Sequence, residues 1–141
     1  AAGDAGRGAL LSLYYVDTSA AGKLVLRERG SAAMNRWAET HDGDFCSSDI
    51  LRVELLRAVR RTAPEFLARA RSVLDTMLLT ALSSEMLERA ARIEPVQLRS
   101  LDALHLVAAL ELGDELEGVV TYDERLAEAA RSNGVPVISP R

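Results

Sequence analysis

The sequence contains few cysteines, histidines and aromatic residues, and each shortage excludes a class of protein. Cys46 is the only cysteine, and His41 and His105 are the only histidines, among 141 residues. One cysteine cannot form an internal disulfide, and three such side chains are too few for a zinc site of cysteine and histidine ligands. Aromatic residues make up 4% of the chain, which argues against a single-strand binder built on stacked aromatic rings.

Long apolar runs and an excess of positive charge are also missing. No apolar stretch approaches the length of a membrane span, and the start of the chain lacks the segments of a signal peptide, so the sequence predicts a cytoplasmic protein. The net charge of −4 argues against a protein held on nucleic acid by bulk electrostatics alone. Lys23 is the only lysine. Arginine suits bidentate contacts with phosphate or carboxylate, although a coding bias toward alanine and arginine explains the same composition.

The length and composition predict one globular domain. A chain with 48% hydrophobic and 27% charged residues can bury a core without disulfides. We expect residues 1–12, rich in alanine and glycine, to be a flexible leader or an expression remnant, and residues 13–141 to form the domain. Runs typical of strands alternate with helical stretches, which predicts a three-layer α/β/α domain with a mostly parallel sheet of four to five strands.

The expected elements follow from hydrophobic periodicity and turn residues. Strands are expected at 13–16, 45–47, 78–82, 118–121 and 135–138, with 78–82 buried and 135–138 at an edge. Helices are expected at 20–27, 31–40, 50–61, 64–74, 101–112 and 124–132, and another after Ser84. Hydroxyl or carboxylate side chains are expected to cap most of these helices: Thr18 and Ser19, Ser31, Ser47 to Asp49, Ser83 and Ser100.

Four carboxylates stand among apolar residues, where a folded protein rarely buries charge. They are Asp17, Glu54, Asp102 and Asp123. Asp17 and Asp123 follow predicted strands, and ligands of open parallel sheets bind beyond the carboxyl ends of strands. Glu54 and Asp102 edge the apolar faces of their helices, so both are expected to point toward the sheet.

Carboxylates gathered in one pocket repel one another, by roughly 4 kcal/mol per close pair at an intermediate dielectric, and a divalent cation removes that penalty. Mg²⁺ or Mn²⁺ accepts carboxylate oxygens and can activate water and orient a phosphodiester. The acids therefore predict metal-assisted phosphoryl hydrolysis, and no other convincing nucleophile is present.

Each acid alone also fits a structural role. Asp17 and Asp123 suit helix caps, Asp102 suits the positive end of a helix dipole, and Glu54 suits a helix flank. An aspartyl-phosphate phosphatase is a competing metal-dependent enzyme, but it needs a second acid where this chain has Ser19. His105 is interpreted as a hydrogen-bonded core residue rather than a catalytic one.

Four segments of the chain match one family in order and spacing. They are Tyr15-Val16-Asp17-Thr18-Ser19-Ala20, Ser48-Asp49-Ile50-Leu51-Arg52-Val53-Glu54-Leu55, Leu98-Arg99-Ser100-Leu101-Asp102-Ala103-Leu104-His105-Leu106 and Val120-Thr121-Tyr122-Asp123-Glu124-Arg125-Leu126. On the basis of these four segments, the chain resembles the PIN-domain ribonucleases, and most closely the VapC-like toxins of bacterial type II toxin–antitoxin systems. The resemblance covers roughly residues 14–140.

The resemblance implies a metal-dependent endoribonuclease with Mg²⁺ or Mn²⁺ as cofactor. It implies that Asp17 and Asp102 bind the metal directly, that Asp123 completes the shell, and that Glu54 binds through water. Ser19 and Thr121 would orient the carboxylates. It further implies RNA as substrate, inhibition by a small cognate antitoxin, and a homodimer. A catalytically silent PIN-fold module that binds RNA or protein is the alternative.

The helix of Glu54 carries two further candidate surfaces. Its arginines contact either RNA phosphates or an acidic partner segment, or they form a solvated face: Arg52, Arg57, Arg60 and Arg61. By the resemblance, its apolar residues and those beyond the next turn would form a groove for an antitoxin helix: Leu55, Leu56, Val59, Phe66 and Leu67.

Overall fold

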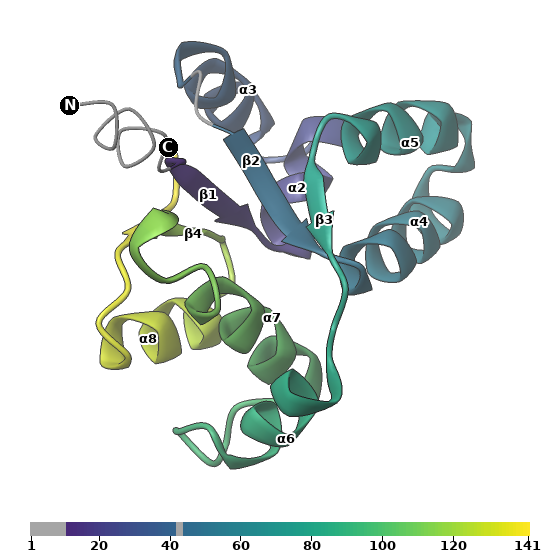
Figure 1. Ribbon diagram of the computed structural model, residues 1–141. Coiled ribbons are helices and arrows are strands. Elements are labelled where there is room, and N and C mark those ends of the chain that lie inside the picture. Colours follow the sequence, from purple (N-terminus) through teal and green to yellow (C-terminus); the bar gives the residue numbers. More distant parts are fainter. Residues whose placement is uncertain (1–10, 42–43) are drawn as a thin grey trace, which may run out of the picture.

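The structure is a computed structural model that describes residues 11–41 and 44–141. In these residues a central sheet lies between two groups of helices (Figure 1). Its five strands are β1 (Leu13–Val16), β2 (Asp44–Ser48), β3 (Leu78–Thr80), β4 (Leu116–Val120) and β5 (Val137–Ile138). Their order is β3-β2-β1-β4-β5, and every neighbouring pair is parallel. The predicted three-layer α/β/α fold is confirmed.

Each face of the sheet has its own layer of helices. One layer contains α2 (Thr18–Val25), α3 (Ser31–Thr40), α4 (Ile50–Thr62) and α5 (Leu67–Asp75), with the 3-10 turn η1 (Pro64–Phe66) between the last two. The other contains α6 (Ser84–Arg92), α7 (Ser100–Leu110) and α8 (Glu124–Ser132), with η2 (Gly113–Glu115) leading into β4. Figure 1 shows α6, α7 and α8 together on one side of the sheet.

The two hydrophobic cores follow from the alternation of side chains along each strand. Successive residues of a strand point to opposite faces of the sheet. Tyr15 and Val119 therefore pack with α6, α7 and α8, whereas Val16 and Val120 pack with the other helical layer. Strands buried on both faces read as continuous apolar runs, as β1 does.

The strands expected at 118–121 and 135–138 are found at Leu116–Val120 and Val137–Ile138, and one further strand differs in burial as well as in length. The segment 78–82 was expected to be a buried strand, but β3 ends at Thr80 and the Leu78 side chain is half exposed. The reason is its place at the sheet edge, where it pairs only with β2. The expected edge position of the last strand, β5, is confirmed.

Several predicted helix caps are wrong, whereas Ser83 caps α6 as expected. Ser31 and Ser100 lie inside the first turns of α3 and α7, and Gly30 (φ +90°) and Arg99 precede these helices. Asp49 precedes α4 without a capping hydrogen bond from its side chain. The hydroxyls near the start of α2 bond elsewhere, because the Asp17 carboxylate takes the capping position.

Two remaining observations concern the ends and the length of the helices. Residues 1–10 of the expected leader lie outside the described residues. Among the residues described, no helix combines the length and the apolar character needed to cross a bilayer.

Candidate active site

The carboxyl ends of β1 and β4 bring two of the four acids to one edge of the sheet. Val16 and Val120 are paired residues of these neighbouring strands. The backbone N–H of Asp17 then donates to the carbonyl of Val120 at 3.2 Å. Asp17 therefore lies beside Thr121, and Thr121 is two residues before Asp123 in the sequence.

Asp17 is the most enclosed of the four acids, with 4% of its surface exposed. One oxygen accepts hydrogen bonds from the Ser19 hydroxyl at 2.7 Å and the Ala20 N–H at 3.0 Å. The other accepts from the Thr121 hydroxyl at 2.5 Å. Burial raises the pKa of Asp17, and these three donors act against that rise. Asp17 is thus both the cap of α2 and a buried carboxylate with fixed orientation.

Thr121 joins Asp17 to Asp123. Its hydroxyl donates to Asp17 and accepts from the backbone N–H of Asp123 at 3.0 Å. Asp123 caps α8, since its Oδ1 accepts from the N–H groups of Arg125 and Leu126. Its Oδ2 accepts from Arg99, which also contacts Asp102.

Arg99 lies between Asp102 and Asp123. Its Nε donates to Asp102 Oδ2 and its Nη2 donates to Asp123 Oδ2, both at 3.2 Å. Burial and the nearby charge of Asp123 raise the pKa of Asp102, and Arg99 counteracts part of this rise. Two carboxylates that repel each other therefore share one guanidinium cation.

Glu54 reaches the site from α4 and pairs with His105 of α7. Its Oε1 accepts from His105 Nε2 at 2.6 Å and from the Thr18 hydroxyl at 2.7 Å. The other ring nitrogen of His105 lies 2.8 Å from the Tyr15 hydroxyl. Burial acts to raise the pKa of Glu54, but the hydrogen bonds from His105 and Thr18 outweigh it and the pKa is lowered.

The donor chemistry of these acids fits a hard divalent cation, which prefers carboxylate oxygens. Asp17 is a buried acid with a raised pKa, and a cation would offset that cost. Their present arrangement is one of linked pairs, however. Within residues 11–41 and 44–141, no three carboxylate, histidine or cysteine side chains form a ready-made set of metal ligands. Binding of a divalent cation by Asp102 and Asp123 would draw these two carboxylates away from Arg99.

The structure places the predicted site residues as follows. Ser19 and Thr121 donate directly to Asp17, the position in which they would orient that carboxylate. Two contacts were not predicted, those of His105 and Arg99. For Arg99 the available signal was its position just before α7, three residues ahead of Asp102 in the first turn of that helix. His105 and Glu54 lie 51 positions apart in sequence, and no local pattern joins them.

Two of the five residues expected to line the apolar groove on α4 do not fit that role, because Leu55 and Val59 are fully buried in the core beneath the helix. Leu56, Phe66 and Leu67 are only partly buried, so a groove formed by these three stays a prediction. Arg57, Arg60 and Arg61 border a shallow pocket on the exposed face of the same helix.

Comparison with known proteins agrees with this geometry. Residues 14–132 match the PIN domain family. Ribonuclease VapC47 of Mycobacterium tuberculosis (strain CDC 1551 / Oshkosh) is 39% identical over 132 residues, which cover 91% of this chain and 97% of that protein. Ribonuclease VapC46 of M. tuberculosis (strain ATCC 25618 / H37Rv) is 35% identical, covering 92% and 99%.

Solved structures share the fold. The crystal structure of M. tuberculosis VapC20, described as a Sarcin-Ricin loop cleaving toxin, superposes with a TM-score of 0.73 at 15% identity, over 90% of this chain and 99% of that one. A toxin–antitoxin complex from Klebsiella pneumoniae gives a TM-score of 0.68 at 21% identity, over 91% and 98%. Together with the site geometry, these matches show that the chain belongs to the PIN-domain family and, within it, to the VapC ribonucleases.

Proposed function

We propose that this protein is a divalent-metal-dependent endoribonuclease that acts as the toxin of a toxin–antitoxin pair. The observation that carries the proposal is the buried Asp17 carboxylate, held by three donors at the sheet edge where Asp123 also lies. The names of the curated relatives, all ribonucleases of the VapC group, support the same reaction.

In this proposal the four acids hold Mg²⁺ or Mn²⁺, and they differ in whether they bind the ion directly or through water. Asp17, Asp102 and Asp123 would bind the ion directly, and Glu54 would bind it through water. When bound, such an ion stabilises negative charge on the phosphate and makes water a better nucleophile. Water would attack the phosphodiester, and the 3′ or 5′ oxygen opposite the attacking water would leave.

The chain's own residues supply orientation. Ser19 and Thr121 fix both oxygens of Asp17, so this carboxylate loses little further entropy when it binds a cation. His105 and Thr18 hold Glu54 in its ionised form, because each donates to the same oxygen. Arg99 offsets part of the negative charge of Asp102 and Asp123 until a cation or a substrate phosphate approaches.

The proposal extends to partners and location. A structural neighbour is, by its title, a toxin–antitoxin complex, which supports a small cognate antitoxin as the inhibitor of this protein. We also propose that this protein forms a homodimer and that it acts in the cytoplasm. A catalytically silent PIN-fold module is not favoured, because all four acids are present and the curated relatives are named ribonucleases.

The test is RNA cleavage by variants that change one carboxylate to an amide. Asp17→Asn and Asp102→Asn should each lose most RNA cleavage in the presence of Mg²⁺ or Mn²⁺, while circular dichroism and thermal melting show that they fold. Asp114→Asn is the matched control, because Asp114 is exposed in η2, before the start of β4. If Asp17→Asn and Asp102→Asn cleave RNA as fast as the parent, the proposal is wrong.

A further inference from the structure

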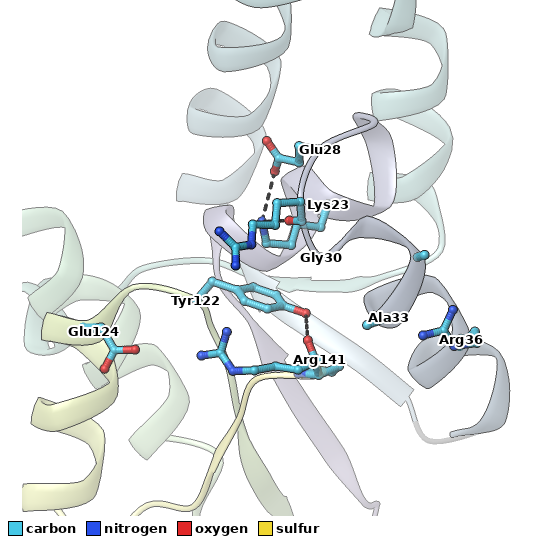
Figure 2. A pocket seen from close by; sticks show the side chains of 11 residues that line it. Lys23, Glu28, Gly30, Ala33, Arg36, Tyr122, Glu124 and Arg141 are labelled. Carbon is cyan, nitrogen blue, oxygen red and sulfur yellow. Dashed lines mark hydrogen bonds and ion pairs between the residues drawn. The ribbon is translucent and has the colours of Figure 1, made fainter.

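A second pocket adjoins the acidic site on the side of α2 and α3. It encloses about 650 Å³ and is lined by residues of α2, of the turn before α3, of α3 itself, of the β4–α8 connection and of the C-terminal segment. Figure 2 shows the Tyr122 ring at its centre, with Lys23 on one side and the Arg141 side chain on another. Tyr122 directly precedes Asp123, so the pocket and the acidic site share one connection.

The pocket is positively charged, in contrast to the chain as a whole. Its lining contains four cationic side chains and two carboxylates. The cations are Lys23, Arg29, Arg36 and Arg141, and the carboxylates are Glu28 and Glu124. A cationic pocket beside an acidic site in a protein of net charge −4 indicates a place for an anion.

Lys23 is held in place rather than extended into solvent. Its side chain is 15% exposed, and its Nζ lies 4.7 Å from the centre of the Tyr122 ring. The same Nζ donates to the carbonyl of Arg29 at 2.6 Å and lies 3.5 Å from Glu28 Oε1. Gly30 leaves room for this arrangement, because a Cβ at its position would come within 3.2 Å of the Lys23 side chain.

Arg29 and Arg36 carry the charge that is available to a ligand. Both side chains are exposed, and within the part of the chain that the structure describes neither forms an ion pair with a carboxylate. Arginine offers several N–H donors in a planar fork that matches phosphate oxygens. Lys23 adds a positive charge whose position is fixed and which Glu28 partly offsets.

The pocket is connected to the acidic site by hydrogen bonds as well as by sequence. The backbone N–H of Tyr122 donates to the Ser19 hydroxyl at 2.8 Å, and this hydroxyl donates to Asp17. The Tyr122 hydroxyl donates to the carbonyl of Pro140 at 2.7 Å, which fixes the ring. A strand of RNA cut at the acids would therefore have a neighbouring phosphate close to this pocket.

We propose that this pocket binds a backbone phosphate of the RNA strand next to the bond that is cut, with Arg29 and Arg36 as the principal contacts. The inference rests on the proposed ribonuclease function and adds a site that positions the substrate. It assigns Arg29 and Arg36 to binding and not to the chemical step.

The experiment compares two double variants that remove the same charge. Arg29→Ala/Arg36→Ala changes the pocket. Arg92→Ala/Arg131→Ala is the control, because Arg92 and Arg131 lie in the last turns of α6 and α8, whereas the acidic site lies at the start of α8. Binding of a short fluorescein-labelled single-stranded RNA of mixed sequence is followed by anisotropy in EDTA, over a series of salt concentrations, so that no cleavage occurs.

The pocket variant should bind more weakly than the parent, and its plot of log affinity against log salt should be shallower by about 0.7, the change expected for the loss of one phosphate contact on a single strand. The control should keep the slope of the parent. Equal slopes for the two double variants, or no measurable binding by the parent at low salt, would overturn the inference. The proposed function is tested separately: if the parent cleaves RNA with Mg²⁺ or Mn²⁺ but the slopes are equal, only the pocket assignment fails.

Discussion

Replacing His105 by alanine tests whether the pair of Glu54 and His105 holds two helical layers together. His105 is 2% exposed, and its two ring nitrogens contact Glu54 of α4 and Tyr15 of β1. The replacement leaves the Tyr15 hydroxyl with Ser48 as its remaining partner, at 3.1 Å. It also leaves Glu54 with Thr18 alone and opens a cavity in place of the imidazole.

The expected cost follows from these contacts. Loss of a hydrogen bond to a charged group costs about 1.5 to 3 kcal/mol, and truncation of a large buried side chain to alanine, with the cavity that it leaves, costs about 2 to 5 kcal/mol. We expect His105→Ala to lower the free energy of unfolding by about 3 to 5 kcal/mol. Glu54→Gln keeps an oxygen that can accept from both donors, so it should cost less than half as much.

The loss should also depend on pH. The pKa of Glu54 is lower in the folded protein than its ordinary value, so its ionised form stabilises the fold at pH above the unfolded pKa. That contribution disappears as the pH falls from about 4.5 through the folded pKa. Urea unfolding of parent and variant at pH 7 and pH 4 measures the difference, which should be larger at pH 7. A His105→Ala protein within about 1 kcal/mol of the parent at pH 7 would refute this account.

Three further predictions concern single side chains. Thr121→Val keeps the shape of the side chain but removes the donor to Asp17, so Mn²⁺ affinity measured by calorimetry should fall about 10- to 100-fold; an unchanged affinity would show that Asp17 needs no such support. Arg99→Ala removes a side chain that is 61% exposed, so the free energy of unfolding should change by less than about 1 kcal/mol. The same variant should bind Mn²⁺ more tightly than the parent, and weaker Mn²⁺ binding would contradict the role of Arg99 as a competing cation. Burial raises the pKa of the Cys46 thiol to about 12, so iodoacetamide at pH 8 should alkylate it about a thousandfold more slowly in the folded than in the unfolded protein; similar rates in mass spectrometry would rule this out.

The sequence was sufficient to predict the layers of the fold and two of the acids at one sheet edge. Parallel strands bring their carboxyl ends to the same side, so residues that follow β1 and β4 lie at one edge of the sheet. The alternation of Tyr15 and Val16 between two cores follows from the same geometry. These features depend only on the order of strands and helices.

Contacts between helices of different layers could not be predicted in this way. Whether His105 reaches Glu54 depends on where α7 lies relative to α4 along the sheet edge, and no periodicity within either helix specifies that. The caps were also mispredicted for a physical reason. Thr18 and Ser19 are good capping residues, but their hydroxyls bond to Glu54 and Asp17, so the carboxylate caps the helix instead. The capping propensity of these two residues is overridden because their hydroxyls hydrogen-bond to carboxylates of the acidic site.

The dependence of RNA cleavage on a divalent ion tests the central claim most directly. The purified parent protein is incubated with RNA in Mg²⁺ or Mn²⁺, then with EDTA, then with the ion restored in excess, and the cleaved ends are counted by sequencing. Cleavage should occur with the ion, stop in EDTA and return when the ion is restored, because carboxylates alone provide neither the charge stabilisation nor the activated water that the reaction needs. Undiminished cleavage in EDTA would contradict the account of the four acids as a metal site.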